Sequence, residues 1–211
     1  MKENYLNIEK GKKFLIVGAG STIKDYQEKI NKRIKEESLI VIGVNNSSCL
    51  FVPDYHIWTN SNRLKTFGST AIHASSKLMF GQGISKKMGS CYGSYIPINY
   101  VDKKGTDLKY KNGKIYGYFR TAGCLSLMIA HLFGASRIEV VGMDGYSLKG
   151  DKIGESQHCY GKGMTDGTTK EYGKEKDDIV YSVLKNIYNY GIKFTILTPT
   201  VFEKFYDSSI L

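Results

Sequence analysis

The chain contains no long apolar segment. It has 211 residues, and no apolar run approaches the ~18 residues that a membrane-spanning helix needs. No apolar stretch follows the charges of Met1-Lys2-Glu3-Asn4, so we expect no secretory signal and a cytoplasmic protein. With 41% hydrophobic and 24% charged residues, the composition excludes a wholly disordered chain, collagen and coiled coil. The length predicts a single domain spanning residues 1–211.

Motifs for metals and activated nucleophiles are also absent. The sequence has no D-x-D, P-loop, H-E-x-x-H or G-x-S-x-G, so we expect no metal site. The four cysteines are far apart and form no C-x-x-C pair, which argues against a zinc knuckle or redox motif and favours reduced thiols. They are Cys49, Cys91, Cys124 and Cys159.

Charge is the most uneven feature that is present. Thirty basic and twenty acidic residues give a formal net charge of +10. Such an excess favours anionic partners such as nucleotides, acidic sugars, nucleic acid or an anionic membrane surface. Because the lysines are spread along the chain, a general lysine-rich surface explains the charge equally well.

Five short apolar runs predict buried strands. Each is continuous rather than alternating and ends in small or polar residues, as in a parallel sheet covered on both faces. They are residues 14–17, 39–44, 55–58, 138–143 and 194–197. Helical patterns over residues 22–36, 121–134 and 173–190 lie between them. We therefore predict an α/β, Rossmann-like sandwich with a mainly parallel sheet, whose ligand crevice lies beyond the carboxyl ends of the strands.

Two segments depart from this alternation. Residues 81–119 are rich in Gly, Tyr, Lys and Ser, and we interpret them as a flexible, lid-like insertion with little regular structure. Residues 149–172 are interpreted as a second, mobile loop, because loops of this length inside a domain are usually functional or disordered. In the last helix, the pattern predicts a buried face formed by Ile179, Val183, Leu184 and Ile187.

A glycine turn, Gly18-Ala19-Gly20-Ser21-Thr22, follows the first predicted strand. Glycines allow a backbone to approach a phosphate closely, and a helix N-terminus favours an anion; a purely structural turn is the alternative. Asn45 and Asn46, not an acidic residue, follow the next strand. This disfavours NAD binding.

Asparagines follow two neighbouring strands, at Asn45 and Asn46 and at Asn60 and Asn62. A carboxamide carries both donors and an acceptor and can bind sugar hydroxyls or base edges; ordinary turn chemistry explains Asn there equally well. The segment 120–123, Arg-Thr-Ala-Gly, opens a predicted buried helix and either binds an anion through its amides or is a plain capped helix start.

Histidine is the candidate base. Since His158 lies in a polar loop, its imidazole is suited to take a proton near neutral pH. His56 and His131 lie in apolar segments and are interpreted as core residues, and His73 has no supporting context. A nucleophilic pair of His158 and Cys159 is disfavoured, because adjacent residues of a strand point to opposite faces.

In order and spacing, these motifs resemble the bacterial lipooligosaccharide sialyltransferases over most of residues 13–206. That family uses a Rossmann-like domain and CMP-sialic acid. The resemblance implies a glycosyltransferase that needs no cofactor besides its nucleotide-sugar donor and transfers the sugar to a glycan acceptor, possibly lipid-linked, at the inner face of the membrane. It implies His158 as general base and Tyr146 as donor to the departing phosphate. The implied donor contacts are Gly18, Gly20, Ser21, Asn45, Asn60, Thr121, Ala122, Gly123 and Asp144, with Tyr160 or Tyr172 as a second phosphate-binding tyrosine.

Two other functions remain open. The motility accessory factors and the hydroxymethylpterin pyrophosphokinase-like proteins share the expected fold and the late Gly-x-Asp strand end, and a pyrophosphokinase would use ATP and magnesium. A non-catalytic nucleotide-binding module is favoured only by the net charge. Since the interleaved basic and aromatic pattern of single-strand binders is missing, we expect no nucleic acid partner; a homo-oligomer remains open.

Overall fold

The computed structural model describes residues 5–148, 158–161 and 170–211. Its centre is a seven-stranded sheet in the order β10-β9-β1-β2-β3-β4-β5, in which every pair is parallel. The strands are β1 (Lys13–Val17), β2 (Ile40–Val44), β3 (Tyr55–Trp58), β4 (Lys77–Gly81), β5 (Tyr95–Ile98), β9 (Arg137–Val141) and β10 (Thr195–Ile196). The predicted α/β, Rossmann-like fold with a parallel sheet is confirmed.

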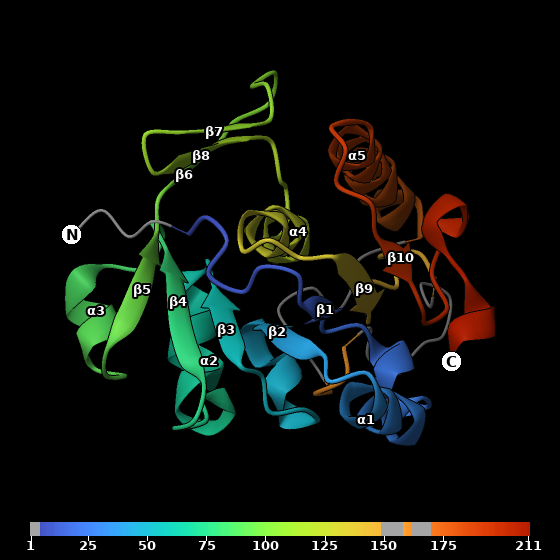
Figure 1. Ribbon diagram of the computed structural model, residues 1–211, viewed down its shortest axis with the longest axis horizontal. Helices are drawn as coiled ribbons and strands as arrows, with labels where there is room; N and C mark the ends of the chain where they lie inside the picture. Colours follow the sequence, from blue (N-terminus) through green and yellow to red (C-terminus); the bar gives the residue numbers. More distant parts are fainter. Residues whose placement is uncertain (1–4, 149–157, 162–169) are drawn as a thin grey trace.

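Helices cover both faces of this sheet (Figure 1). One face carries α4 (Ala122–Leu132) and α5 (Lys170–Asn189), and the other carries α1 (Gln27–Glu36) and α2 (Ser61–Ala71). A short α3 (Lys86–Ser90) lies beside the edge strand β5. Most of α4 is buried, because its apolar residues pack on the sheet and on α5. Burial of apolar surface on both sides of the strands is the main stabilisation of such a fold.

The chain reverses direction across the sheet between β1 and β9. From β1 it runs outward through β2, β3, β4 and β5, and then returns to β9 on the other side of β1. The loops after β1 and β9 therefore diverge to opposite sides, which leaves a crevice at their carboxyl ends. This is the position at which the fold favours a ligand.

Residues 81–119 are more regular than the sequence suggests. They include α3 and β5, which completes the main sheet, and a second sheet of three strands. These strands are β6 (Tyr100–Asp102), β7 (Lys109–Lys111) and β8 (Lys114–Gly117). The expectation of little regular structure is wrong here, because strands this short are paired through tertiary contacts rather than marked by a long apolar run. Whether the segment acts as a lid stays a prediction.

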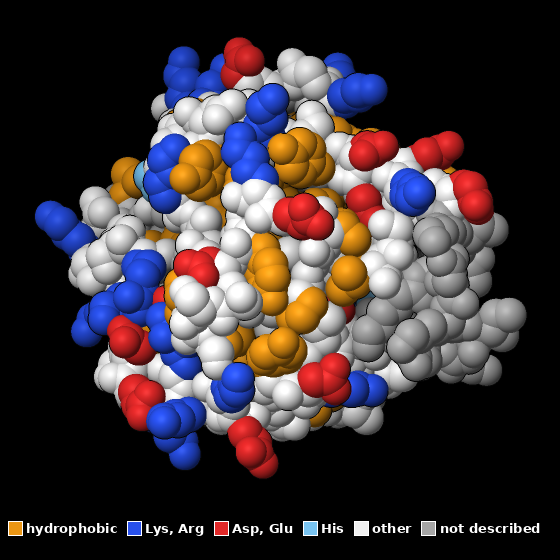
Figure 2. Space-filling model, turned by 90° about the vertical axis from the view of Figure 1, so that its right-hand side faces the viewer, with side chains coloured by type: hydrophobic (Ala, Val, Ile, Leu, Met, Phe, Trp, Pro, Cys, Tyr) orange, Lys and Arg blue, Asp and Glu red, His pale blue; other side chains and the backbone are white. Residues whose placement is uncertain are grey.

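Helix boundaries also differ from the sequence-based ones. The segment 22–36 divides into a 3-10 helix η1 (Ser21–Lys24) and α1. On α5, Val180 is buried and Ile179 is 39% exposed. The prediction that Ile179 belongs to the buried face is therefore wrong. Figure 2 shows the side of the molecule on which α5 and the C-terminus lie. Since α5 begins at Lys170, the last residues of the predicted loop 149–172 are helical, while 149–157 and 162–169 lie outside the described residues.

Candidate functional site

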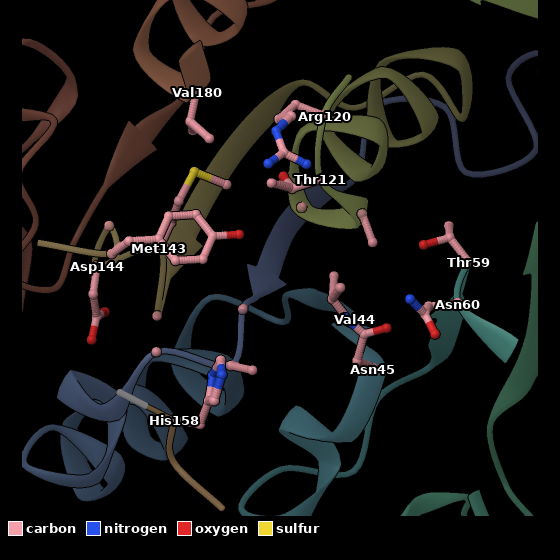
Figure 3. A pocket seen from close by; sticks show the side chains of 18 of the residues that line it. Val44, Asn45, Thr59, Asn60, Arg120, Thr121, Met143, Asp144, His158 and Val180 are labelled. Atoms are coloured by element: carbon pink, nitrogen blue, oxygen red, sulfur yellow. The ribbon is translucent and has the colours of Figure 1, made fainter. Parts of the chain in front are cut away.

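A pocket of about 330 Å3 opens at the crevice between β1 and β9. Its size falls in the usual range for small-ligand sites. The predicted residues that line it are Gly18, Gly20, Asn45, Asn60, Thr121, Ala122, Gly123, Asp144, Tyr146 and His158. Figure 3 shows Arg120 and Thr121 on one wall, His158 on the opposite wall and Asn45 and Asn60 together on a third.

The glycine turn is required by close backbone packing. A Cβ at Gly18 would lie 2.3 Å from the carbonyl oxygen of Gly142, and a Cβ at Gly20 would lie 2.3 Å from the Asp144 carboxylate. The amide of Gly20 donates to the carbonyl of Gly142 at 2.9 Å. Any larger residue would therefore separate the ends of β1 and β9, where the pocket lies.

Asp144 fixes the same turn with its side chain. It is 5% exposed, and its carboxylate accepts hydrogen bonds from the Thr22 amide at 2.9 Å and from the Thr22 hydroxyl at 2.5 Å. These bonds hold the start of η1 against the end of β9. Asp144 lines the pocket, but a direct contact with a nucleotide stays a prediction.

Asn45 is held in place by a buried histidine. Its φ of 53° lies in the left-handed region, which Asn tolerates better than most residues. Nε2 of His56 donates a hydrogen bond to the Asn45 carbonyl oxygen. Burial lowers the pKa of His56 to about 4, so the ring is neutral at physiological pH. The Asn45 side-chain oxygen is buried without a protein donor among the described residues, and the residue lines the pocket.

The two polar atoms of the Asn60 carboxamide have different surroundings. Its side-chain oxygen accepts from the Arg63 amide at 3.0 Å and caps α2. The side-chain nitrogen points toward the pocket in Figure 3, where it can donate to a ligand. Arg63, one turn further along α2, also lines the pocket.

The start of α4 presents backbone donors and a cation. Thr121 caps the helix by accepting from the Cys124 amide at 3.1 Å, and its own amide donates to the Phe119 carbonyl. Thr121 therefore does not offer its amide to an anion, contrary to the sequence-based expectation. The amides of Ala122 and Gly123 have no acceptor in the described contacts, and Arg120, whose φ is 62°, reaches into the pocket beside them. A ligand anion is favoured at this helix end.

Tyr146 is positioned by α5. Asp177, 6% exposed on that helix, accepts from the amide of Tyr146 at 2.7 Å and from the amide of Ser147 at 2.8 Å. Burial raises the pKa of Tyr146, so the hydroxyl keeps its proton at neutral pH. A protonated phenol on the pocket wall can donate a hydrogen bond to an anionic ligand.

His158 lies next to the glycine turn. An antiparallel bridge pairs Gly20 with His158, and the Cys159 amide donates to the Ala19 carbonyl at 2.9 Å. The Tyr160 ring stacks on the imidazole, with centroids 4.8 Å apart and planes 7° apart. The Tyr160 hydroxyl accepts from the Arg63 guanidinium at 2.9 Å. The segment 158–161 thus connects the turn after β1 to α2.

Three predicted contact residues lie outside the pocket lining. Ser21 is buried in η1, Tyr160 packs behind His158 against Phe67, and Tyr172 lies exposed on α5 under Lys176. Arg63 and Arg120 also line the pocket, and neither has a role in the sequence-based prediction. A signal for Arg63 was its position one helical turn after Asn60, and for Arg120 its position directly before the capping Thr121.

The pocket combines groups that suit an anionic, hydroxyl-rich ligand. It holds the guanidinium groups of Arg63 and Arg120, the helix end at Ala122 and two carboxamides. The carboxylate of Asp144, which also lines the pocket, already accepts hydrogen bonds from Thr22. In the part of the chain that the structure describes, no three His, Cys, Asp or Glu side chains lie together as a metal site would require.

Comparison with known proteins adds information on the fold. No protein-family model matches the chain, and no curated protein matches it. Among solved structures, it is similar to a MAf glycosyltransferase from Magnetospirillum magneticum AMB-1, with 12% sequence identity and a TM-score of 0.56 over 95% of this chain. The match covers 36% of that structure's chain, so the present chain spans little more than a third of its length. At this identity the similarity establishes a shared Rossmann-like fold.

Proposed function

We propose that the protein is a glycosyltransferase that moves sialic acid, or a related acidic nine-carbon sugar, from a CMP donor to a glycan hydroxyl without a metal ion. The observation that carries this proposal is the pocket at the β1–β9 crevice, which places cations, carboxamides and a histidine around one space. The fold shared with the MAf glycosyltransferase supports the same class of reaction.

The donor has two anionic groups, a phosphate and a sugar carboxylate. We place the phosphate at the glycine turn beside Tyr146, and the carboxylate at the start of α4 beside Arg120. Asn45 and Asn60 then bind the nucleoside through its hydroxyls and base edge. The placement is supported by the position of Asn45 in the pocket lining and by the Asn60 nitrogen that points toward the pocket.

In the transfer step, the bond from the anomeric carbon to the phosphate oxygen breaks, and CMP leaves with the electron pair. Tyr146 donates a hydrogen bond to that oxygen as its negative charge grows. The acceptor hydroxyl forms the new bond to the anomeric carbon, and its proton passes to the imidazole of His158. His158 lies on the wall opposite Arg120, so the acceptor hydroxyl would reach the sugar from that side.

Thermal unfolding with nucleotides tests the proposal directly. A ligand at 100 times its Kd stabilises the fold by about 2.7 kcal/mol, so CMP should raise Tm clearly, with or without magnesium. UDP, GTP and ATP should do so less. Stabilisation by ATP with magnesium but not by CMP would favour the pyrophosphokinase-like alternative. Nucleotide binding without sugar transfer to any acceptor would favour a non-catalytic module.

The acceptor and the location are part of the same proposal. We place the protein at the anionic inner surface of a membrane, where a lipid-linked glycan would be found. No helix in the described residues is both long and apolar enough to cross the bilayer. The support for surface binding is the outer face of the small sheet, because side chains alternate between faces along a strand. Three residues of these strands pack toward the core: Tyr100, Tyr110 and Ile115. Their direct neighbours along each strand therefore face outward; these are Val101, Lys109, Lys111, Lys114 and Tyr116.

A further inference from the structure

Two of the four cysteines meet beside the candidate site. Cys49 ends the 3-10 helix η2 (Asn45–Cys49), and Cys159 directly follows His158. Their sulfur atoms are 3.7 Å apart, although the residues are 110 positions apart in sequence. The sequence contains no motif that signals this pair, because the fold alone brings the two segments together.

The two thiols have opposite environments. Cys49 is exposed, whereas Cys159 is 4% exposed. The hydrogen bond from Cys159, with a smaller contribution from the charge of Lys24, lowers the pKa of Cys49 to about 7. The same contact and burial raise the pKa of Cys159. An exposed thiol that ionises near neutral pH, close to a cation, is the kind that reacts with oxidants.

The other cysteines lack this combination. Cys124 is fully buried in α4, and burial raises its pKa to about 12. Cys91 is exposed, but its thiol donates to the carbonyl of Lys87 in the same helix turn, and no other sulfur lies near it among the contacts of the described residues. They serve as internal controls.

We propose that Cys49 and Cys159 form an oxidation site, at which hydrogen peroxide converts the two thiols into an intramolecular disulfide. The Cys49 thiolate attacks one oxygen of the peroxide; an S–O bond forms, the O–O bond breaks and hydroxide leaves, giving a sulfenic acid. The Cys159 thiol then loses its proton and attacks the Cys49 sulfur, which expels the second oxygen as water once it is protonated. Two thiols and one peroxide thus give one disulfide and two waters.

The geometry requires only a small movement. A disulfide needs a sulfur–sulfur distance of about 2.05 Å, so the two atoms must approach by less than the width of one atom. The backbone of Cys159 is already fixed by its hydrogen bond to Ala19, which leaves the exposed end of η2 to adjust. The cross-link ties the residue after His158 to the helix whose first residue, Asn45, lines the pocket. Neither step depends on the proposed function.

The test uses the full-length protein and mass spectrometry. After treatment with hydrogen peroxide, we expect the intact protein to lose the mass of two hydrogen atoms. After free thiols are then blocked, digestion should give one cross-linked peptide that joins Cys49 to Cys159. Dithiothreitol should reverse the change. Cys91→Ser should leave the cross-link intact, and Cys49→Ser, a change at an exposed position, should abolish it.

A second measurement keeps the inference testable even where Cys159 variants fold poorly. Alkylation of Cys49 by iodoacetamide in the reduced wild-type protein should reach half its maximal rate near pH 7 and should exceed alkylation of Cys91 at that pH. Cys159→Ala should move this midpoint to higher pH, because the donor to the thiolate is lost. Three results would overturn the proposal: overoxidation of Cys49 without a cross-link, a cross-link through Cys91, or dimers joined through Cys49.

Discussion

His158 is held by neighbours from three parts of the chain. Gly20 pairs with its backbone, Tyr160 stacks on its ring, and Arg63 holds Tyr160 through its hydroxyl. A ring stacked and tethered in this way is pre-oriented, which is what a general base needs to meet an acceptor proton. Tyr160 therefore positions the histidine in this structure; the phosphate contact that the family resemblance implies for Tyr160 or Tyr172 stays a prediction.

The first prediction concerns the base itself. His158→Ala should lower the rate of sugar transfer by about 10²–10⁴-fold, the usual contribution of general base catalysis. The affinity for CMP should change less than the rate, because the imidazole acts on the acceptor proton, although His158 lies beside the glycine turn. Turnover at saturating donor and isothermal titration with CMP measure the two effects separately.

The controls are matched to the histidine and to its stacking partner. His131 is exposed at the last turn of α4, so its interpretation as a core residue is wrong. His131→Gln therefore removes an exposed imidazole and should leave transfer unchanged. Tyr160→Phe keeps the stacked ring but removes the acceptor of Arg63, so it should cost less activity than Tyr160→Ala. Wild-type turnover in His158→Ala would require another base.

At the scale of elements, β3 and η2 are joined through one neutral histidine. His56 is fully buried on β3, and its Nε2 donates to the first residue of η2. Since burial disfavours the charged ring, the pKa of His56 is lowered from 6.5 to about 4. Protonation of this group therefore opposes the folded state.

The second prediction follows from that shift. Between pH 6.5 and pH 4 the unfolded chain binds a proton at His56 that the folded chain binds weakly, so stability falls as pH falls. Above about pH 7 this proton does not affect the free energy of unfolding. By pH 4 it has lowered that free energy by roughly 3 kcal/mol. Denaturant unfolding at several pH values measures it. In His56→Gln, which keeps a side-chain donor, the pH dependence over this window should be weaker by that amount; an unchanged curve contradicts the assignment.

The central strands of the main sheet and its edge strand β10 follow from sequence, whereas β4 and the other edge strand, β5, do not. Residues 14–17 and 39–44 are continuous apolar runs, and such runs form the buried centre of a parallel sheet. β4 and β5 carry Lys77 and Pro97 and are recognised only by their pairing. On α5, the adjacent apolar residues Ile179 and Val180 are both candidates for the buried face. Successive residues are rotated by 100° about the helix axis, so a small error in the orientation of the helix exchanges one for the other.

The candidate site was predictable where it lies at strand ends. Gly18, Asn45 and Asp144 each follow a strand of the parallel sheet, and such ends converge on one edge. Arg63 could not be found in this way, because it reaches the pocket from the side of a helix. The contact between Cys49 and Cys159 depends on tertiary packing that local patterns do not contain.

At the scale of the whole molecule, the basic side chains that give the net charge of +10 are not arranged in the same way on every face. On the face shown in Figure 2, basic and acidic side chains are mixed around a central group of hydrophobic ones. The small sheet differs, because its outward face has three lysines and no acidic residue. The amino groups of Lys109 and Lys114 lie 5.6 and 5.7 Å from the centre of the Tyr116 ring. Lysine with an interfacial tyrosine suits an anionic lipid surface.

The third prediction tests this face. Each lysine near an anionic bilayer contributes about 1 kcal/mol, so a variant with Lys109, Lys111 and Lys114 changed to Gln should bind vesicles containing phosphatidylglycerol roughly 10²-fold more weakly. Binding of the wild type should fall with salt and be absent on phosphatidylcholine alone. Sedimentation with vesicles measures all of these effects.

The matched control lies on α1, on the other side of the main sheet (Figure 1). Lys29, Lys32 and Lys35 are exposed there, and Lys29 also lies over a tyrosine ring, that of Tyr26. Changing these three to Gln removes the same charge, so equal weakening by both triple variants would show a general charge effect and no dedicated surface. Binding to a soluble polyanion but not to vesicles would point to an acidic glycan instead.

The pocket draws its wall from Gly18 near the start of the chain, from Asn45, Arg120 and Gly142, and from Phe202 near its end. Only a fragment of nearly the full length contains all of these residues, so the pocket forms only when the whole fold is complete. A bound ligand can therefore suppress only those openings that separate the strand ends. In hydrogen exchange, saturating ligand should slow the amides of β1, β2 and β9 by a common factor, while fraying of the small sheet should continue as before.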